Sequence, residues 1–424
     1  MTRVSRRTAL VVLGGVAVAG IAGLVVSVHE PALARIARPA RENFEADSVR
    51  RGEQLATLGD CIVCHTADDG APFAGSRPLR TPFGTLYSTN ITPDELTGIG
   101  NWSEEAFVRA MKNGVARDGN HLYPALPYEH FTHVTDGDLK AIYAFLMTRR
   151  SVSRETPAND LLPGLGFRPL LAGWKLLFLR RGEFEPVMDR TAEWNRGKYL
   201  VEGLAHCGAC HTPRNLVGGE ERGREFDGGV AEGWNAPALD ASNPSADRWT
   251  ETSLHAYLKT GFDKAHGAAG GPMGPVAEGL SRVDDADVKA IAVYVAARMQ
   301  AGKDRNILAI DNAVEAETRF PQGAHLFQGA CAGCHETGSP MGQQGRPPLS
   351  QLTAVKMADP TNAALALLQG LPATNGRDQL MPPFAETMSD KDLADVLAYV
   401  RARFSDGPAW ENLKSLITTA RLED

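Results

Sequence analysis

The pattern Cys-x-x-Cys-His occurs three times in this chain of 424 residues and uses all six of its cysteines. The three copies are Cys61-Ile-Val-Cys64-His65, Cys207-Gly-Ala-Cys210-His211 and Cys331-Ala-Gly-Cys334-His335. Two thiols three positions apart can each form a thioether to a vinyl group of one porphyrin, and the next residue then lies where its imidazole binds the iron. Each motif is therefore predicted to attach one haem, so that the chain carries three haem c groups.

Three other uses of paired cysteines fit the sequence less well. A redox Cys-x-x-Cys of the thioredoxin kind needs no following histidine and belongs next to a β-α-β pattern, which is not evident here. A zinc site requires such pairs to come together, or a pair followed by His-x₃₋₅-His. Disulfides would not explain a histidine after every pair. Haem attachment remains the interpretation that uses every residue of the motif.

The surroundings of the three motifs are also repeated, with a period of roughly a hundred residues. A short helical stretch with a glycine precedes each motif, and each repeat ends in an amphipathic helix with an aromatic residue. The glycines are Gly52, Gly197 and Gly323, and the aromatic residues are Phe145, Tyr294 and Tyr399. Because glycine leaves room for a ring at a close helix crossing, the first and last helix of each repeat are expected to cross at this pair.

These features resemble the cytochrome c fold and predict an all-α protein with three tandem haem domains after an N-terminal signal or anchor helix. The expected segments are 1–45 (signal or membrane anchor), 46–150 (domain 1), 151–190 (proline-containing linker), 191–300 (domain 2), 305–408 (domain 3) and 409–424 (C-terminal tail). Within the linker, the apolar stretch 171–179 is too short to span a bilayer. We expect this stretch to pack between domains, to touch the membrane surface or to dock a partner protein.

The N-terminus has the features of an export signal. Arg3, Arg6 and Arg7 precede an uncharged, largely apolar run over residues 8–28. The run is long enough for one membrane span, and the small residues 32–34 offer a cleavage site, so both a retained anchor and a cleaved signal remain open. In either case the positive-inside rule predicts that the body of the protein lies on the periplasmic face of the inner membrane. The net charge of −7 argues against a nucleic-acid partner.

Methionine is the usual sixth ligand opposite the motif histidine, and it raises the reduction potential of the iron. Met273 and Met381 lie in glycine- and proline-rich loops ahead of the last helix of the second and third repeats, and they are the predicted ligands there. In the first repeat the matching position is Leu126, which cannot bind iron. The candidates for that haem are Met147, which is our first choice, Met111, His121, His130, or no protein ligand at all.

Several longer stretches are more specific than the motifs. They are residues 88–94 (STNITPD), 97–103 (TGIGNWS), 117–125 (RDGNHLYPA) and 193–215, which include the second motif. Over residues 51–400 the chain resembles the tri-haem cytochrome c subunits of bacterial membrane-associated dehydrogenases, which serve quinoprotein, flavin-dependent and molybdenum-containing catalytic subunits. Leu126 departs from those members of the family that have methionine at this position.

The resemblance implies a function in electron transfer. A separate catalytic subunit would oxidise an alcohol, aldehyde, sugar or N-heterocycle, and electrons would pass along the three haems to ubiquinone in the cell membrane or to another respiratory acceptor. The sequence has no dinucleotide-binding fingerprint and no P-loop of its own. Two alternatives remain: a haem enzyme, such as a peroxidase or reductase, that acts at an open first haem, and a free-standing electron carrier to a terminal oxidase.

Overall fold

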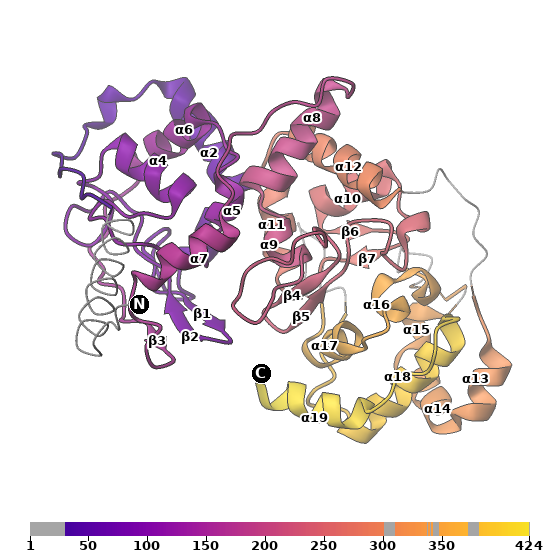
Figure 1. Cartoon of the computed structure of the whole chain (residues 1–424). Coiled ribbons are helices and arrows are strands. Elements are labelled where there is room, and N and C mark those ends of the chain that lie inside the picture. Colours follow the sequence, from indigo (N-terminus) through magenta and orange to yellow (C-terminus); the bar gives the residue numbers. More distant parts are fainter. Residues whose placement is uncertain are drawn as a thin grey trace, which may run out of the picture. The chain divides into compact units, whose positions relative to one another are not determined.

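The computed structural model describes residues 30–300, 310–336, 338–339, 341, 347–371 and 381–423. The chain forms two compact units (Figure 1): residues up to Glu53 with Cys64–Glu183, and Gln54–Val63 with Phe184–Asp424. None of the helices in the described ranges combines the length and the apolar character that a bilayer crossing needs. The apolar run 8–28 lies outside these ranges, so the signal or anchor remains a prediction.

The first unit contains helices joined by long loops, together with one small sheet. Its elements are η1 (Arg41–Asn43), α2 (Ala46–Leu58), α3 (Cys61–Cys64), β1 (Pro78–Thr81), β2 (Gly84–Tyr87), α4 (Glu104–Asn113), α5 (Tyr128–Phe131), α6 (Asp136–Met147), β3 (Asp160–Leu161) and α7 (Leu170–Phe178). The boundary between the two units passes through α2 and the first Cys-x-x-Cys-His motif.

The second unit contains the other two repeats. The first of these comprises α8 (Ala192–Tyr199), the π-helix η2 (Leu200–Leu204), α9 (Gly208–His211), β4 (Gly229–Ala231), β5 (Trp234–Ala236), η3 (Ala246–Arg248), α10 (Glu251–Thr260), β6 (Phe262–Asp263), β7 (Gly267–Ala268), α11 (Met273–Ser281) and α12 (Asp285–Met299). The other comprises α13 (Ala313–Arg319), α14 (Pro321–Ala330), α15 (Ala332–His335), η4 (Leu349–Gln351), α16 (Thr353–Lys356), α17 (Thr361–Gln369), α18 (Asp390–Phe404) and α19 (Leu413–Glu423). The division into three haem domains stays a prediction.

The predicted helix crossing is present in all three repeats. A Cβ added to Gly52 on α2 would lie 1.9 Å from the Ala141 carbonyl oxygen on α6. The corresponding distances are 2.0 Å from Gly197 to the Ala290 oxygen, and 2.1 Å from Gly323 to the Asp395 oxygen. In each case the Cβ of the predicted aromatic residue also lies within 3 Å: Phe145, Tyr294 and Tyr399. Any side chain at these glycines would overlap backbone atoms, so the glycine sets how closely the two helices approach.

An ion pair supports this crossing in the first two repeats. Arg51 Nε lies 2.7 Å from Asp138 Oδ1, and Arg196 Nε lies 2.7 Å from Asp287 Oδ1. Each arginine directly precedes the crossing glycine, and each aspartate belongs to the first turn of the last helix. Besides the close packing, the two helices are therefore joined by charge-assisted hydrogen bonds.

The all-α prediction was right about the helices but missed several short strands. β1 and β2 pair antiparallel from Pro78↔Tyr87 to Thr81↔Gly84, and β3 adds to β2 at Gly84↔Leu161. β4–β5 and β6–β7 form two further antiparallel pairs. Since β3 lies in the segment predicted as a linker, part of that segment folds as the third strand of the first unit's sheet.

Candidate haem-attachment sites

Each Cys-x-x-Cys-His motif coincides with a single helical turn. The turns are α3, α9 and α15, and none of the six cysteines is in a disulfide bond. Residues three apart on a helix lie on the same face, so one turn brings the two sulfur atoms of a motif to one side. This arrangement suits two thioether bonds to a single porphyrin.

Cys207 and Cys331 lack the lowered pKa of a redox-active thiol. Burial raises the pKa of the Cys207 thiol to about 12 and that of Cys331 to about 11. Reactive cysteines in redox Cys-x-x-Cys motifs instead have lowered pKa values, because the thiolate is the attacking species. Among the described residues there is also no group of three or more His, Cys, Asp or Glu side chains that could hold a metal ion.

The motif histidines of the first two repeats are oriented by backbone carbonyl groups. His65 Nδ1 lies 2.6 Å from the Thr89 oxygen, and His211 Nδ1 lies 2.6 Å from the Pro237 oxygen. Burial lowers the pKa of both imidazoles, which favours the neutral ring. A neutral ring that donates its Nδ1 proton to a carbonyl presents the lone pair of Nε2 to a metal, and such a partner also fixes the ring orientation. These two side chains therefore fit an axial iron ligand.

The backbone around these two histidines is held in the same way. The His65 carbonyl oxygen accepts a hydrogen bond of 2.8 Å from the Gly75 amide, and the His211 oxygen accepts one of 2.9 Å from the Gly228 amide. Each histidine is thus fixed through both its ring and its own carbonyl group. The repeat seen in the sequence extends to the hydrogen bonds of the site.

The residue after each of these histidines is a threonine that fixes a loop phenylalanine. Thr66 Oγ1 accepts a hydrogen bond of 3.2 Å from the Phe73 amide, and Thr212 Oγ1 accepts one of 3.1 Å from the Phe226 amide. Both phenylalanines have left-handed backbone conformations, with φ of 63° and 69°. Such a conformation is strained for a bulky residue and persists only where its surroundings impose it.

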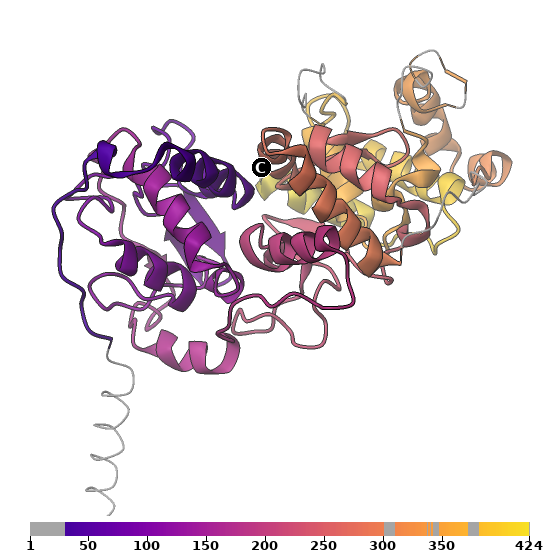
Figure 2. The same ribbon diagram turned by 90° about the horizontal axis from the view of Figure 1, so that it is seen from above.

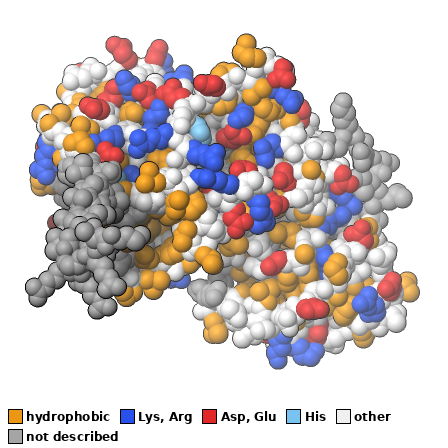
Figure 3. Space-filling model, viewed as in Figure 1, with side chains coloured by type: hydrophobic (Ala, Val, Ile, Leu, Met, Phe, Trp, Pro, Cys, Tyr) orange, Lys and Arg blue, Asp and Glu red, His pale blue; other side chains and the backbone are white. Residues whose placement is uncertain are grey.

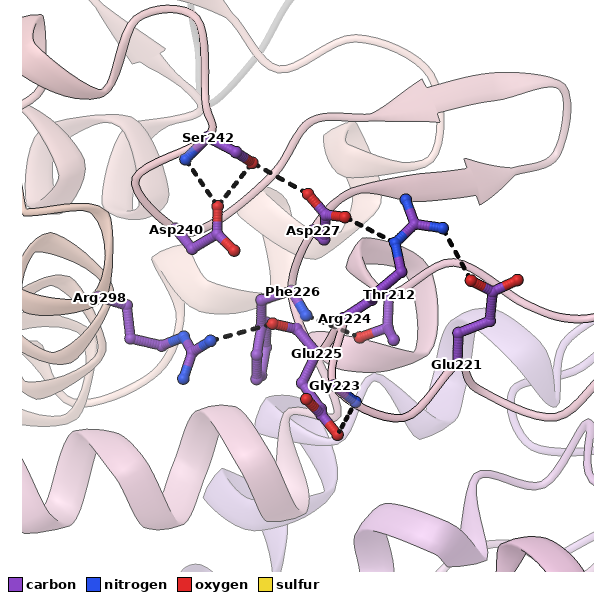
Figure 4. A network of polar contacts seen from close by, with 10 residues as sticks. All are labelled: Thr212, Glu221, Gly223, Arg224, Glu225, Phe226, Asp227, Asp240, Ser242 and Arg298. Carbon is purple, nitrogen blue, oxygen red and sulfur yellow. Dashed lines mark hydrogen bonds and ion pairs between the residues drawn. The ribbon is translucent and has the colours of Figure 1, made fainter.

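Polar contacts also fix the loop after the second motif (Figure 4). The Arg224 guanidinium lies 2.8 Å from Asp227 and 2.7 Å from Glu221, and Ser242 donates to Asp227 at 3.1 Å. From α12, Arg298 donates to the Glu225 oxygen at 3.0 Å. The loop that contains Phe226 is therefore tied to the last helix of its repeat.

The third repeat uses a different arrangement after its histidine. Glu336 stands where Thr66 and Thr212 stand in the other repeats, and its carboxylate pairs with Arg403 on α18 at 2.6 Å. Arg403 is almost fully buried and also contacts Asp311 at 2.7 Å. These ion pairs raise the pKa of Arg403 well above its ordinary value. Sequence analysis missed this network, since its members are 67 and 92 positions apart.

A hairpin in the first and second repeats defines which loop residues correspond. The Leu122 amide donates to the Gly114 oxygen at 2.8 Å, and the Ala269 amide donates to the Gly261 oxygen at 2.9 Å. Both glycines end the preceding helix in a left-handed conformation. Leu126 and Met273 each follow four residues after the donor, so the structure confirms that they occupy matching positions.

Met381 occupies a different position in its hairpin. It pairs with Leu371, directly after the helix-ending Gly370. In the first repeat the residue that pairs in this way is His121, with Val115. Met381 therefore matches His121 in register rather than Leu126. Met273 and Met381 were predicted as equivalent ligands, but they occupy different positions in the hairpins of their repeats.

The other candidates for the first haem are buried in helices or loops. Met147 is the last residue of α6 and Met111 lies on α4, and both side chains are buried. His121 and His130 are also buried. Counting from the aromatic residue of the last helix, Met147 corresponds to Ala296 on α12 and Arg401 on α18. Burial does not show whether Met147 binds iron, so Met147 as the sixth ligand stays a prediction.

Comparison with known proteins shows which proteins this chain is similar to. The cytochrome c family model matches residues 321–403. A subunit of nicotinate dehydrogenase from Pseudomonas putida is 44% identical over 95% of this chain, which spans only 35% of that relative. The gluconate 2-dehydrogenase cytochrome c subunit from Pantoea cypripedii is 35% identical over 85% of this chain and 86% of its own length. A diheme cytochrome c-type protein from Cereibacter sphaeroides is 34% identical over 68% of this chain and 97% of its own length.

Proposed function

Because the chain belongs to the family of cytochrome c subunits of bacterial dehydrogenases, we propose that it carries three haem c groups and transfers electrons from a catalytic subunit to ubiquinone or another respiratory acceptor. We place this activity on the periplasmic face of the inner membrane, because the N-terminal sequence has the features of an export signal. The observation that carries the proposal is that, in the first two motifs, two cysteines outside any disulfide are followed by a histidine whose Nδ1 is hydrogen-bonded to a carbonyl group.

The number of haems is supported by the repeats. The same glycine crossing recurs around all three motifs, and the hydrogen bonds of the motif histidine recur in two of them. The diheme relative matches 68% of this chain, which leaves about a third of the sequence for a further haem domain. The match of the family model to residues 321–403 falls within the third repeat.

Haem iron would supply reversible one-electron transfer. The residues described above would hold the haem: the cysteines would anchor the porphyrin, His65, His211 and His335 would each bind one iron, and Met273 and Met381 would add a second ligand in their repeats. Carbonyl partners such as those of Thr89 and Pro237 orient the ligand and increase its basicity, which is how a protein tunes a metal through its surroundings.

The relatives also suggest the kind of catalytic partner. Identity to the nicotinate dehydrogenase relative is 44%, against 35% to the gluconate dehydrogenase relative. This difference favours a partner that acts on an N-heterocyclic substrate over one that oxidises a sugar acid.

For the sixth ligand of the first haem, we keep Met147 and add support for His121. His121 shares the hairpin position of Met381, whereas Leu126, at the position of Met273, has no donor atom. An imidazole and a thioether give different optical spectra and potentials, so spectroscopy of variants separates the two.

The test is a reduction experiment with the purified chain and the dehydrogenase subunit that co-purifies with it. On addition of the substrate of that subunit, we expect all three haems to become reduced, and then to be reoxidised by a soluble ubiquinone analogue. Rapid peroxide turnover or carbon monoxide binding at one haem would instead favour the enzyme alternative. A chain that forms no complex with a dehydrogenase and is not reduced by one would overturn the proposal.

A further inference from the structure

The helix α7 of the first unit buries its charged side chain and exposes several of its apolar ones. Its one charged residue, Lys175, is buried, while Leu176 is 83% exposed and Leu177 is 62% exposed. Surface helices normally turn charged residues to water and leucines to the core. The exposed side of α7 is therefore suited to a non-aqueous neighbour.

The inner side of α7 explains why the helix is fixed in this orientation. Lys175 Nζ donates to the carbonyl oxygens of Asn113 at 2.8 Å and Gly114 at 3.1 Å, so it caps the C-terminal end of α4. Trp174 packs edge-on against Tyr128 with ring centroids 6.1 Å apart. Because these contacts hold the inner side, the leucines cannot turn inward without breaking them.

The outer side of α7 exposes apolar side chains. Leu170, Leu176 and Leu177, with Gly173 between them, lie on this side, which we call the outer face of α7. In space-filling view, hydrophobic side chains gather over α7 (Figure 3), and seen from above α7 lies at the edge of the first unit (Figure 2). Phe167, just before the helix, is also exposed.

The chain segment that contains this face has charges of one sign. Between Asp160 and Glu183 the chain contains no acidic residue and four basic ones. Arg168 and Lys175 are used internally, since Arg168 donates to the His121 oxygen at 3.0 Å. Arg180 and Arg181 are exposed directly after the helix. Exposed arginines beside an apolar face match a bilayer that contains anionic lipids, because the headgroups attract the cations and the acyl region accepts the leucines.

The chain that follows the N-terminal apolar run is fixed near the same part of the unit. Arg109 on α4 donates to the Pro31 oxygen at 2.7 Å, and the Leu33 amide donates to the Arg117 oxygen at 2.8 Å. Glu30 is close enough to Lys175 to interact with it electrostatically. Residues 30–33 therefore lie beside the end of α4 that Lys175 caps.

We propose that the outer face of α7 lies in the surface of a lipid bilayer, with Arg180 and Arg181 at anionic headgroups. α7 then lies along the membrane surface as a contact separate from the N-terminal run. This contact orients the first unit against the membrane. It does not depend on the number of haems, so its test and that of the proposed function can fail independently.

The test measures how deeply a residue of the outer face enters the bilayer. The full-length haem protein with Leu176→Cys carries a nitroxide label and is bound to vesicles of phosphatidylcholine and phosphatidylglycerol. We expect the label to become more accessible to oxygen and less accessible to a water-soluble nickel chelate when vesicles are added. Leu96→Cys, a matched control in the same unit with a 90% exposed leucine, should stay accessible to the nickel chelate throughout.

The charge part of the proposal has its own variant. Arg180→Gln with Arg181→Gln should lower the ratio of immersed to non-immersed label at position 176 about fivefold for each arginine in anionic vesicles. In pure phosphatidylcholine the same variant should change little.

Three results would overturn the proposal. The label at position 176 stays accessible to nickel while the protein is bound to vesicles. The label is shielded from both agents only when the dehydrogenase subunit is added, which would make the face a protein interface. The label is shielded before vesicles are added, which would indicate contact between copies of this chain.

Discussion

The second and third repeats share the crossing of their first and last helices but hold the residue after the motif histidine by different means. In the second repeat Thr212 bonds to a backbone amide within the next loop, whereas in the third Glu336 forms an ion pair with Arg403 on the last helix. The contact in the second repeat is local and uncharged. The contact in the third repeat joins distant segments of the chain through an ion pair with the buried Arg403. The comparison teaches that the helix crossing is common to the repeats, while the contacts of the residue after the motif histidine differ in the third repeat.

The largest change is expected from the sixth ligand of the second haem. Met273→Leu makes this position equal to Leu126 of the first repeat, and removes one of the predicted methionine ligands. The charge-transfer band that methionine-bound ferric haem shows in the far red should fall by about a third if Met147 binds the first haem, and by about half if it does not. Optical spectra of the oxidised protein measure it.

The reverse change, Leu126→Met, should increase the same band if the first haem has His121 or no ligand opposite His65. An unchanged band in Leu126→Met would agree with a first haem that already binds Met147. His121→Ala then separates the remaining cases, because its loss should alter only a haem that His121 ligates.

The buried network of the third repeat gives the largest expected effect on stability. Arg403→Met leaves the carboxylates of Asp311 and Glu336 without the guanidinium that they share. Breaking a fully buried ion pair costs about 3–5 kcal/mol; because these carboxylates are 35% and 31% exposed, we expect a loss near the lower end, about 3 kcal/mol. Unfolding by urea measures the loss. Arg319→Met, which removes an exposed i,i+4 pair with Glu315, is the control and should change stability by less than about 0.5 kcal/mol.

The shared crossing is tested by Gly197→Ala. The added Cβ meets the Ala290 oxygen at 2.0 Å, so the helices must separate, at a cost of about 1–3 kcal/mol or more. Gly137→Ala, where nothing lies within 4 Å, is the matched control. Equal stability of the two variants would show that the crossing glycine is not required.

The last effect is spread over a range of pH and concerns the first unit, where α7 adds a buried lysine. Burial lowers the pKa of Lys175 from 10.5 to about 8. Between these values the unfolded chain binds more protons, so the stability of the folded state should rise with pH from about 8 to 10.5. The slope from this group is at most about 1.4 kcal/mol per pH unit.

Urea unfolding across this pH range measures the slope, and Lys175→Met should remove it. Lys112, whose ion pairs with Asp136 and Glu183 raise its pKa, offers a contrast, since Lys112→Met should leave the slope in this window unchanged. A slope that persists in Lys175→Met would show that another group causes it.

Sequence alone predicted those features that depend on short patterns. The glycine and the aromatic residue of each repeat meet as expected, because a close crossing requires a residue without a side chain at a fixed helical position. The match of Leu126 with Met273 also followed, since both lie at similar distances from the last helix. These features need only local spacing and one helix pair.

The rest depends on contacts that spacing does not encode. The carbonyl partners of the histidines, Thr89 and Pro237, are 24 and 26 residues away and are backbone atoms, which no residue type identifies. Met381 shares its register with His121 because the hairpin pairing, rather than the distance to the helix, fixes the position. The short strands were missed because pairs of two to four residues leave almost no alternating pattern.

The central claim is that the three motifs each bind one haem through two thioether bonds. The most direct measurement is the intact mass of the purified chain together with its haem content after extraction with acidified acetone. We predict three haems per polypeptide that resist extraction, and the loss of one haem in each of the variants Cys61→Ala/Cys64→Ala, Cys207→Ala/Cys210→Ala and Cys331→Ala/Cys334→Ala. Pigment that extracts into the solvent, or a mass that corresponds to fewer than three haems in protein from cells able to attach them, would contradict the account.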